Sequence, residues 1–236
     1  MNEAPPPQSD KVRELLREVE ADRAAIFRLA GQAILRQSTT MFPLDFLAIG
    51  AVKRNVSTAA GFRRMVESWN MVCARSLLRI HIDTALRFSA AWLVSDPHTF
   101  AQQVLKGERI DKLKGQSGAR LTDAHLIEVR TTEYPWLPRV YKHLSGYVHF
   151  SGSHIYDSVL SADKSEGSIE FEVTEFDSLY PESSWIEVVE CFREGTEFLA
   201  KYLNGYGVTK RMSPDQLAAM KRQLTHPSSG QLPASR

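Results

Sequence analysis

Two histidines, two serines and two tyrosines gather within the eleven residues from Tyr141 to Ser151. Spacings of three and four residues predict that Lys142, Ser145 and His149 share one side of a helix. A group that exchanges a proton near neutral pH would then stand beside a hydroxyl and a positive charge. These residue types in this arrangement favour acid–base chemistry at a candidate site.

Cleavage of RNA without a metal is one reaction that such residues can perform. It needs a group that accepts the 2′-hydroxyl proton, a group that protonates the leaving oxygen, and a cation that stabilises the phosphorane. We expect His149 to act as the acid or base, with His143 or His154 as its partner. The hydroxyls of Ser145 and Ser151 would orient an imidazole or a phosphate.

A line of charged residues marks a second place of interest. Arg75, Arg79, Asp83 and Arg87 are each four residues apart, and apolar residues flank the line on both sides. This pattern predicts a central helix, whose charges must meet partners or a cleft because unpaired buried charge costs several kcal/mol. We expect Arg79 or Asp83 to approach the candidate site. Arg79 or Lys142 would supply its cation, and Arg75 and Asp83 would contribute to binding.

The same residues also fit a structural interpretation, which stays open. A histidine on a half-apolar helix such as His149 can serve only as a hydrogen-bond donor within the fold. Arg79 and Asp83 can form an ion pair that ties two helices together. The clustering of these side chains therefore does not by itself separate catalysis from packing.

The elements that would position these residues are mainly helical. Apolar residues at helical spacing and capping residues predict helices over 10–37, 43–53, 58–92 with a kink near 61–70, 97–107, from 123 onward, and 184–203. Alternation of Ile169, Phe171 and Val173 with polar residues predicts one β-hairpin, with arms near 154–160 and 168–174. We expect a single mainly α domain over 9–225, with disordered segments at 1–8 and 226–236.

Composition limits the classes of function. The chain has 236 residues, and its formal net charge of +1 creates no global field that would attract nucleic acid or membrane. Because no apolar stretch approaches about 20 residues and no signal peptide is recognisable, we expect a cytoplasmic protein. Cys73 and Cys191 sit in apolar patterns, which predicts buried free thiols. Phosphate-loop, dinucleotide and zinc motifs are missing, so the sequence predicts neither a cofactor nor a metal site.

Residues 69–153 resemble a group of bacterial HEPN-like domains of unassigned function. The resemblance rests on the helix that carries Arg75, Arg79 and Asp83, on the Asp-Pro start of the next helix, and on the motif Tyr-x-x-Leu-Ser-x-x-Val-His-x-Ser from Tyr141 to Ser151. It implies a compact helical bundle and a homodimer. It also implies a metal-independent endoribonuclease in phage defence or a toxin–antitoxin system, with RNA or a nucleotide and a cognate antitoxin or defence protein as partners.

The segment of the candidate site departs from the catalytic signature of that family, an arginine followed after four to six residues by a histidine on a late helix. Arg120 and His125 have four residues between them, but this pair spans a loop and a helix start. Three residues separate Arg139 from His143, and nine separate it from His149. This departure favours a non-catalytic helical module that binds a protein or a nucleotide. The clustered histidines, serines, lysine and arginines favour the ribonuclease instead, so both functions remain open at this stage. The predicted fold is an HEPN-like helical bundle with one added β-hairpin.

Overall fold

A computed structural model describes residues 6–35, 40–163, 165, 167–177, 179–213, 215–217 and 219–220. These residues are mainly α-helical, with one two-stranded antiparallel hairpin, as the sequence predicts. The segment 226–236, for which we expected disorder, lies outside the described residues. Residues 1–5 of the expected N-terminal disordered segment lie outside them as well, whereas Gln8 of that segment is buried and donates a hydrogen bond to the carbonyl oxygen of Val66 at 2.8 Å.

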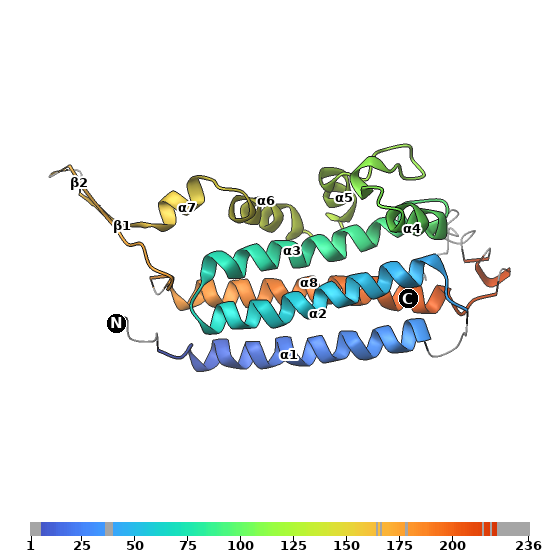
Figure 1. Cartoon of the computed structure of the whole chain (residues 1–236), viewed down its shortest axis with the longest axis horizontal. Coiled ribbons are helices and arrows are strands. Elements are labelled where there is room, and N and C mark those ends of the chain that lie inside the picture. The colour runs from blue at the N-terminus through green and yellow to red at the C-terminus, as the bar shows by residue number, and fades with distance from the viewer. Residues whose placement is uncertain are drawn as a thin grey trace, which may run out of the picture.

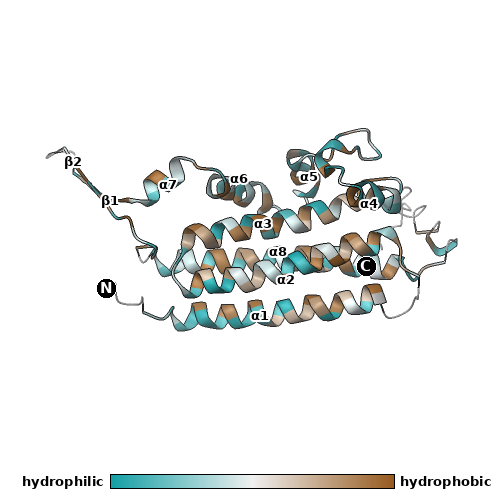
Figure 2. Ribbon diagram, in the orientation of Figure 1, coloured by the Kyte–Doolittle hydropathy of each residue, from teal (hydrophilic) through white to brown (hydrophobic). Residues whose placement is uncertain are grey.

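Four long helices form the central bundle (Figure 1). They are α1 (Asp10–Ala30), α2 (Pro43–Glu67), α3 (Met71–Ser89) and α8 (Glu182–Thr209). Helix α1 packs against α2 and α8, and α3 packs against the same two helices from the other side. In Figure 2 apolar and polar residues are interspersed along these helices, as expected for helices that bury one face.

Local chemistry explains where these helices begin. The Ser9 hydroxyl accepts a hydrogen bond from the backbone of Val12 at 3.3 Å, which caps α1, and Pro43 occupies the first turn of α2. Helix α1 continues into a π-helical turn, η1 (Gly31–Leu35). The end of the expected helix, residues 36 and 37, is outside the described residues.

The expected helices 43–53 and 58–92 are divided differently in the structure. One helix, α2, covers Pro43–Glu67, and the break before α3 falls at Trp69, whose φ is 58°. Asn70 then caps α3 by accepting a hydrogen bond from the backbone of Cys73 at 2.9 Å. The kink expected near 61–70 is therefore a complete break, because a left-handed residue and a new cap both end the helical hydrogen bonds.

The bundle core includes a buried histidine whose ring nitrogens both have hydrogen-bond partners. His81 is 1% exposed, and its ring nitrogens lie 3.1 Å from the Thr58 hydroxyl and 2.9 Å from the Thr196 hydroxyl. Its ring stacks on Phe192 with 3.7 Å between the centroids. Gly195 permits this approach, because a Cβ atom there would lie 2.8 Å from the His81 ring.

A second layer covers one side of the bundle (Figure 1). It contains α4 (Pro97–Leu105), α5 (Asp123–Arg130) and α6 (Leu137–Val148), with short 3-10 turns η2 (Ala90–Trp92) and η3 (Ile110–Lys112). Helix α4 packs on α2, whereas α5 and α6 pack on α3 and on each other. The charged line of α3 therefore faces α5 and α6.

An arm projects from the end of this layer (Figure 1). It begins at Phe150 and includes α7 (Gly152–Asp157), β1 (Val159–Asp163) and β2 (Ser168–Phe171). The hairpin lies within the expected region 154–174, but residues 154–157 are helical rather than extended. Ser151 caps α7 through the backbone of Ser153 at 3.3 Å, which explains this helical turn.

The two cysteines differ from the expectation of buried thiols. Cys73 is exposed and Cys191 is half-buried, and neither forms a disulfide. Cys73 lies in the first turn of α3, where Met71 and Ala74 are buried and Cys73 takes the exposed side of the turn. The apolar pattern around Cys73 therefore predicted its environment wrongly.

Candidate functional site

Helix α6 places the residues of the candidate site on different sides. Tyr141, Leu144 and Tyr147 are buried against α3. Lys142 therefore lies on the exposed side of α6, and Ser145 is half-buried, with its hydroxyl donating to the Tyr141 carbonyl oxygen at 2.8 Å. The apolar stripe of α6 decides this orientation, because it must face the bundle.

His149 does not join Lys142 and Ser145 on the helix. Helix α6 ends at Val148, and His149 has extended backbone angles, φ −111° and ψ 139°. Its side chain is exposed. The shared helical ridge that the spacing predicted therefore ends one residue before the histidine on which the acid–base mechanism depends.

The charged line of α3 meets partners on α5 and α6. Arg79 stacks on the ring of Tyr141, 3.4 Å from its centroid, and lies 3.5 Å from Asp123. Arg87 binds both Asp123 and Asp83, the latter at 3.0 Å, while Arg79 lies 3.7 Å from Asp83. The Tyr141 hydroxyl donates to Asp123 at 2.7 Å. We call these five residues the α3 ion network.

The α3 ion network explains how these charges tolerate partial burial. The side chains of Arg79 and Asp83 are only 15% and 13% exposed, so each needs an opposite charge nearby. Burial, followed by the hydrogen bond to Asp123, raises the pKa of Tyr141, so its phenol remains a neutral donor. Arg79 thus approaches α6 at Tyr141, and neither Ser145 nor His149 is among its contacts.

Arg75 is held one turn earlier on α3. Its guanidinium lies 4.7 Å from the ring centroids of both Tyr147 and Tyr180, and it donates hydrogen bonds to both hydroxyls. The neighbouring Ser76 hydroxyl donates to the Tyr147 carbonyl oxygen at 2.8 Å. Arg75 therefore holds α6 and the segment before α8 against α3, which fits a positioning role better than contact with a substrate.

The remaining predicted residues surround Tyr147. His143 and His154 flank its ring, with centroids 5.6 and 5.7 Å away. The Ser151 hydroxyl donates to the Gly146 carbonyl oxygen at 2.9 Å, so it fixes the turn from α6 to α7. Neither contact forms an acid–base pair.

A small pocket of about 250 Å³ opens where α3, α6 and α8 meet. Arg75 and His143 line it together with apolar side chains, and Arg139 and Glu187 lie 3.8 Å apart beside it. Partial burial, followed by the charge of Arg75, lowers the pKa of His143, which favours its neutral imidazole. The pocket thus brings together Arg75 and His143, but none of the other predicted site residues line it.

The pocket offers little reactive chemistry. Burial, followed by the charge of Glu187, raises the pKa of the Cys191 thiol to about 11, which removes the thiolate that a nucleophile needs. Among the described side chains, no three His, Cys, Asp or Glu residues come close enough to hold a metal ion. None of the described helices combines the length and apolar composition needed to cross a membrane.

Sequence reasoning missed three residues that organise this region: Asp123, Tyr147 and Tyr180. The tyrosine at 147 was detectable, because Tyr141, Leu144 and Tyr147 recur every three residues along the buried side of α6. Asp123 and Tyr180 come from other elements, and no spacing within the chain connects them to α3.

These contacts are more typical of side chains that hold helices together or bind a partner than of catalytic groups. The arginines of α3 are engaged by carboxylates and tyrosines, and the exposed His149 stands apart from them. No protein-family model, curated protein or solved structure matches this chain, so we infer its function from the geometry described above.

Proposed function

We propose that this protein is a non-catalytic helical module that binds a second copy of itself through the arm, residues 150–173. The observation that carries the proposal is the exposure of large apolar side chains along the arm. Phe150 is 87% exposed, Tyr156 77% and Val173 90%. Monomeric proteins rarely leave apolar patches larger than a few hundred Å² uncovered, and such patches commonly mark binding surfaces.

The hairpin of the arm separates apolar from polar residues. Ala162 pairs with Ile169, and Val159 pairs with Phe171, which places four apolar side chains on one face. The opposite face contains Ser161, whose hydroxyl donates to Glu170 at 2.8 Å. The exposed fraction of both Ile169 and Phe171 is 58%. The described part of the chain leaves this apolar face uncovered.

An isolated two-stranded hairpin is at best marginally stable in water and needs cover on its apolar face. A second copy supplies an identical apolar face, so two arms can bury each other about a two-fold axis. The net charge of +1 creates little repulsion between copies. The dimer implied by the HEPN-like resemblance agrees with this arrangement.

Sedimentation velocity between about 1 and 100 μM tests the proposal. We expect a dimer whose dissociation is measurable within that range. The double variant Ile169→Ser, Phe171→Ser should remain monomeric, because it makes the apolar face polar. Glu170→Gln is the matched control on the opposite face of the same strand and should leave the dimer intact. A monomeric unmodified protein throughout that range would contradict the proposal.

The ribonuclease of a defence or toxin–antitoxin system has less support from the geometry. His149 lies beyond the end of α6, and Arg79 is engaged by Tyr141 and Asp123. We therefore expect no RNA cleavage in the presence of a chelator. Chelator-resistant cleavage that His149→Ala abolishes without lowering the melting temperature would restore the catalytic function.

A further inference from the structure

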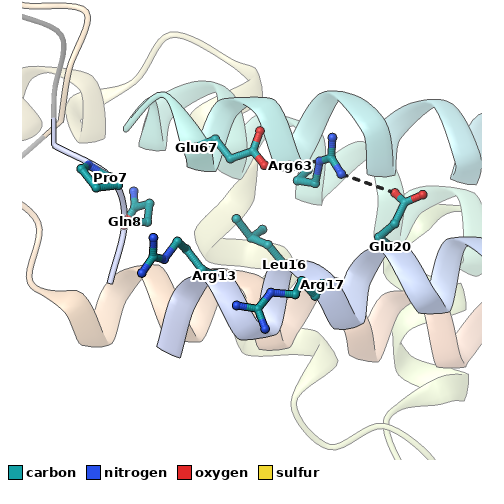
Figure 3. A pocket seen from close by; sticks show the side chains of 8 residues that line it. All are labelled: Pro7, Gln8, Arg13, Leu16, Arg17, Glu20, Arg63 and Glu67. Atoms are coloured by element: carbon teal, nitrogen blue, oxygen red, sulfur yellow. Dashed lines mark ion pairs between the residues drawn. The ribbon is translucent and has the colours of Figure 1, made fainter. Parts of the chain in front are cut away.

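A cleft of about 560 Å³ lies between the first turns of α1 and the last turns of α2 (Figure 3). Pro7 and Gln8 close one end, and the buried Leu16 adds apolar surface. The end wall is anchored, because Gln8 is bonded to Val66 and the Trp69 indole donates to the Pro6 carbonyl oxygen at 2.6 Å. The cleft is thus formed by the folded chain itself.

Three arginines line this cleft. Arg13 and Arg17 are one turn apart on α1, and Arg63 comes from α2. Figure 3 shows the guanidinium of Arg63 directed toward Glu20 and away from the other two arginines. It lies 3.8 Å from Glu20 and 3.4 Å from Glu67, so two carboxylates balance its charge.

The acidic residues near the α1 side of the cleft are each paired with a cation, and Arg13 of the cleft is one of these cations. The pairs are Asp10 with Arg13, Glu14 with Lys11, Glu18 with Arg193, and Glu20 with Arg23. Arg17 makes no hydrogen bond or ion pair with any described residue. The partner of Arg13 is itself weak, since the Asp10 side chain is 93% exposed to solvent.

Positive charge therefore remains on the α1 wall. Like charges four residues apart on a helix repel each other, so Arg13 and Arg17 favour an anion between them. One carboxylate offsets the charge of a single arginine. A phosphate dianion offsets the charge of two arginines and accepts hydrogen bonds from both planar guanidinium groups. The volume also lies within the usual range for small-molecule sites.

We propose that this cleft binds the phosphate of a small organic phosphate, with Arg13 and Arg17 on the phosphate and the organic part against Leu16 and Pro7. The site is separate from the arm and does not depend on dimer formation. Glu20 and Glu67 do not oppose the ligand directly, because Arg23 and Arg63 engage them.

Isothermal titration calorimetry with inorganic pyrophosphate, adenosine monophosphate and citrate tests this site. Pyrophosphate reports on the two arginines alone, and adenosine monophosphate adds an organic part that contacts the apolar wall. We expect both phosphates to bind more tightly than citrate at matched ionic strength. Absence of pyrophosphate binding up to about 10 mM, or tighter binding of citrate, would overturn the proposal.

The decisive variant is Arg17→Gln, with Arg28→Gln as its matched control. Arg28 is an exposed arginine about three turns further along the same helix and outside the cleft. We expect Arg17→Gln to weaken pyrophosphate binding about tenfold, since it removes a charge-assisted contact, and Arg28→Gln to change it less than about twofold. Equal losses in the two variants would show only general charge attraction and would refute a specific site.

Discussion

The four-helix bundle and the arm both separate apolar from polar residues, but only the bundle covers its apolar side chains. Phe62 and Phe192 are fully buried and stack on each other with centroids 4.2 Å apart. Phe171 and Val173 of the arm are 58% and 90% exposed. Alternation in a sequence thus shows which face of an element is apolar. Which other element or molecule buries that face depends on the rest of the fold or on a binding partner.

Two histidines, one in the bundle and one at the start of the arm, show the same contrast between burial and exposure. His81 in the bundle has a hydroxyl partner at each ring nitrogen, whereas His149 at the start of the arm is exposed. Both stand in apolar sequence surroundings. Burial gives His81 a structural role, and exposure leaves His149 without the neighbours that an acid–base pair needs.

The largest predicted effect compares two phenylalanines. Phe192→Ala should lower the free energy of unfolding by about 3 to 5 kcal/mol, because it opens a cavity beneath Phe62 and His81. Phe171→Ala in the arm should cost less than about 0.5 kcal/mol at a protein concentration that favours the monomer. Urea unfolding measures both. Similar losses in the two variants would mean that the arm is part of the core.

A smaller effect is expected from pH. Burial lowers the pKa of His81 to about 3, whereas the unfolded chain restores it to about 6.5. Between these values the unfolded state binds more protons. The free energy of unfolding should therefore fall as the pH drops below about 6.5, by up to about 1.4 kcal/mol per pH unit.

Urea unfolding near pH 7 and pH 5 measures this dependence. His81→Gln should flatten it, because the variant loses the group that protonates on unfolding. His149→Gln is the control, since this side chain is exposed in the folded protein. A pH dependence that survives His81→Gln unchanged would assign it to other groups.

The smallest effect concerns the joint between the bundle and its covering layer. Asp123→Asn should cost about 1 to 2 kcal/mol, because Arg79 and Arg87 lose a shared carboxylate that is partly screened by solvent. Asp111→Asn removes the partner of the exposed Arg109 and should leave the melting temperature unchanged. Calorimetric melting compares the two variants. Equal melting temperatures for them would show that the α3 ion network adds nothing to stability.

Local chemistry predicted much of the fold. Ser9, Pro43 and the pair Asp96 and Pro97 fix helix starts through caps and proline geometry, which act within a few residues. For the break between α2 and α3, local patterns predicted only a kink near 61–70. Asp177, more than a hundred residues away, accepts hydrogen bonds from the start of α3, at 2.7 Å from the backbone of Met71.

The candidate site was predicted less well for the same reason. Spacing correctly identified Arg79, Asp83 and Arg87 as a line of charge that needs partners. It could not identify Asp123, because that residue reaches α3 only after α5 and α6 have packed. Helical spacing also placed His149 on the helix of Lys142 and Ser145, whereas α6 ends one residue earlier, at Val148.

The position of α8 in the chain affects folding during synthesis. Helix α8 supplies one side of the bundle, yet it follows the end of α3 by about ninety residues. At roughly 5 to 20 residues per second, a ribosome needs several seconds to make that stretch. During this interval α1, α2 and α3 have left the ribosome with the apolar surface meant for α8 uncovered. The nascent chain is therefore a candidate client for a chaperone until Phe192 and Phe198 emerge.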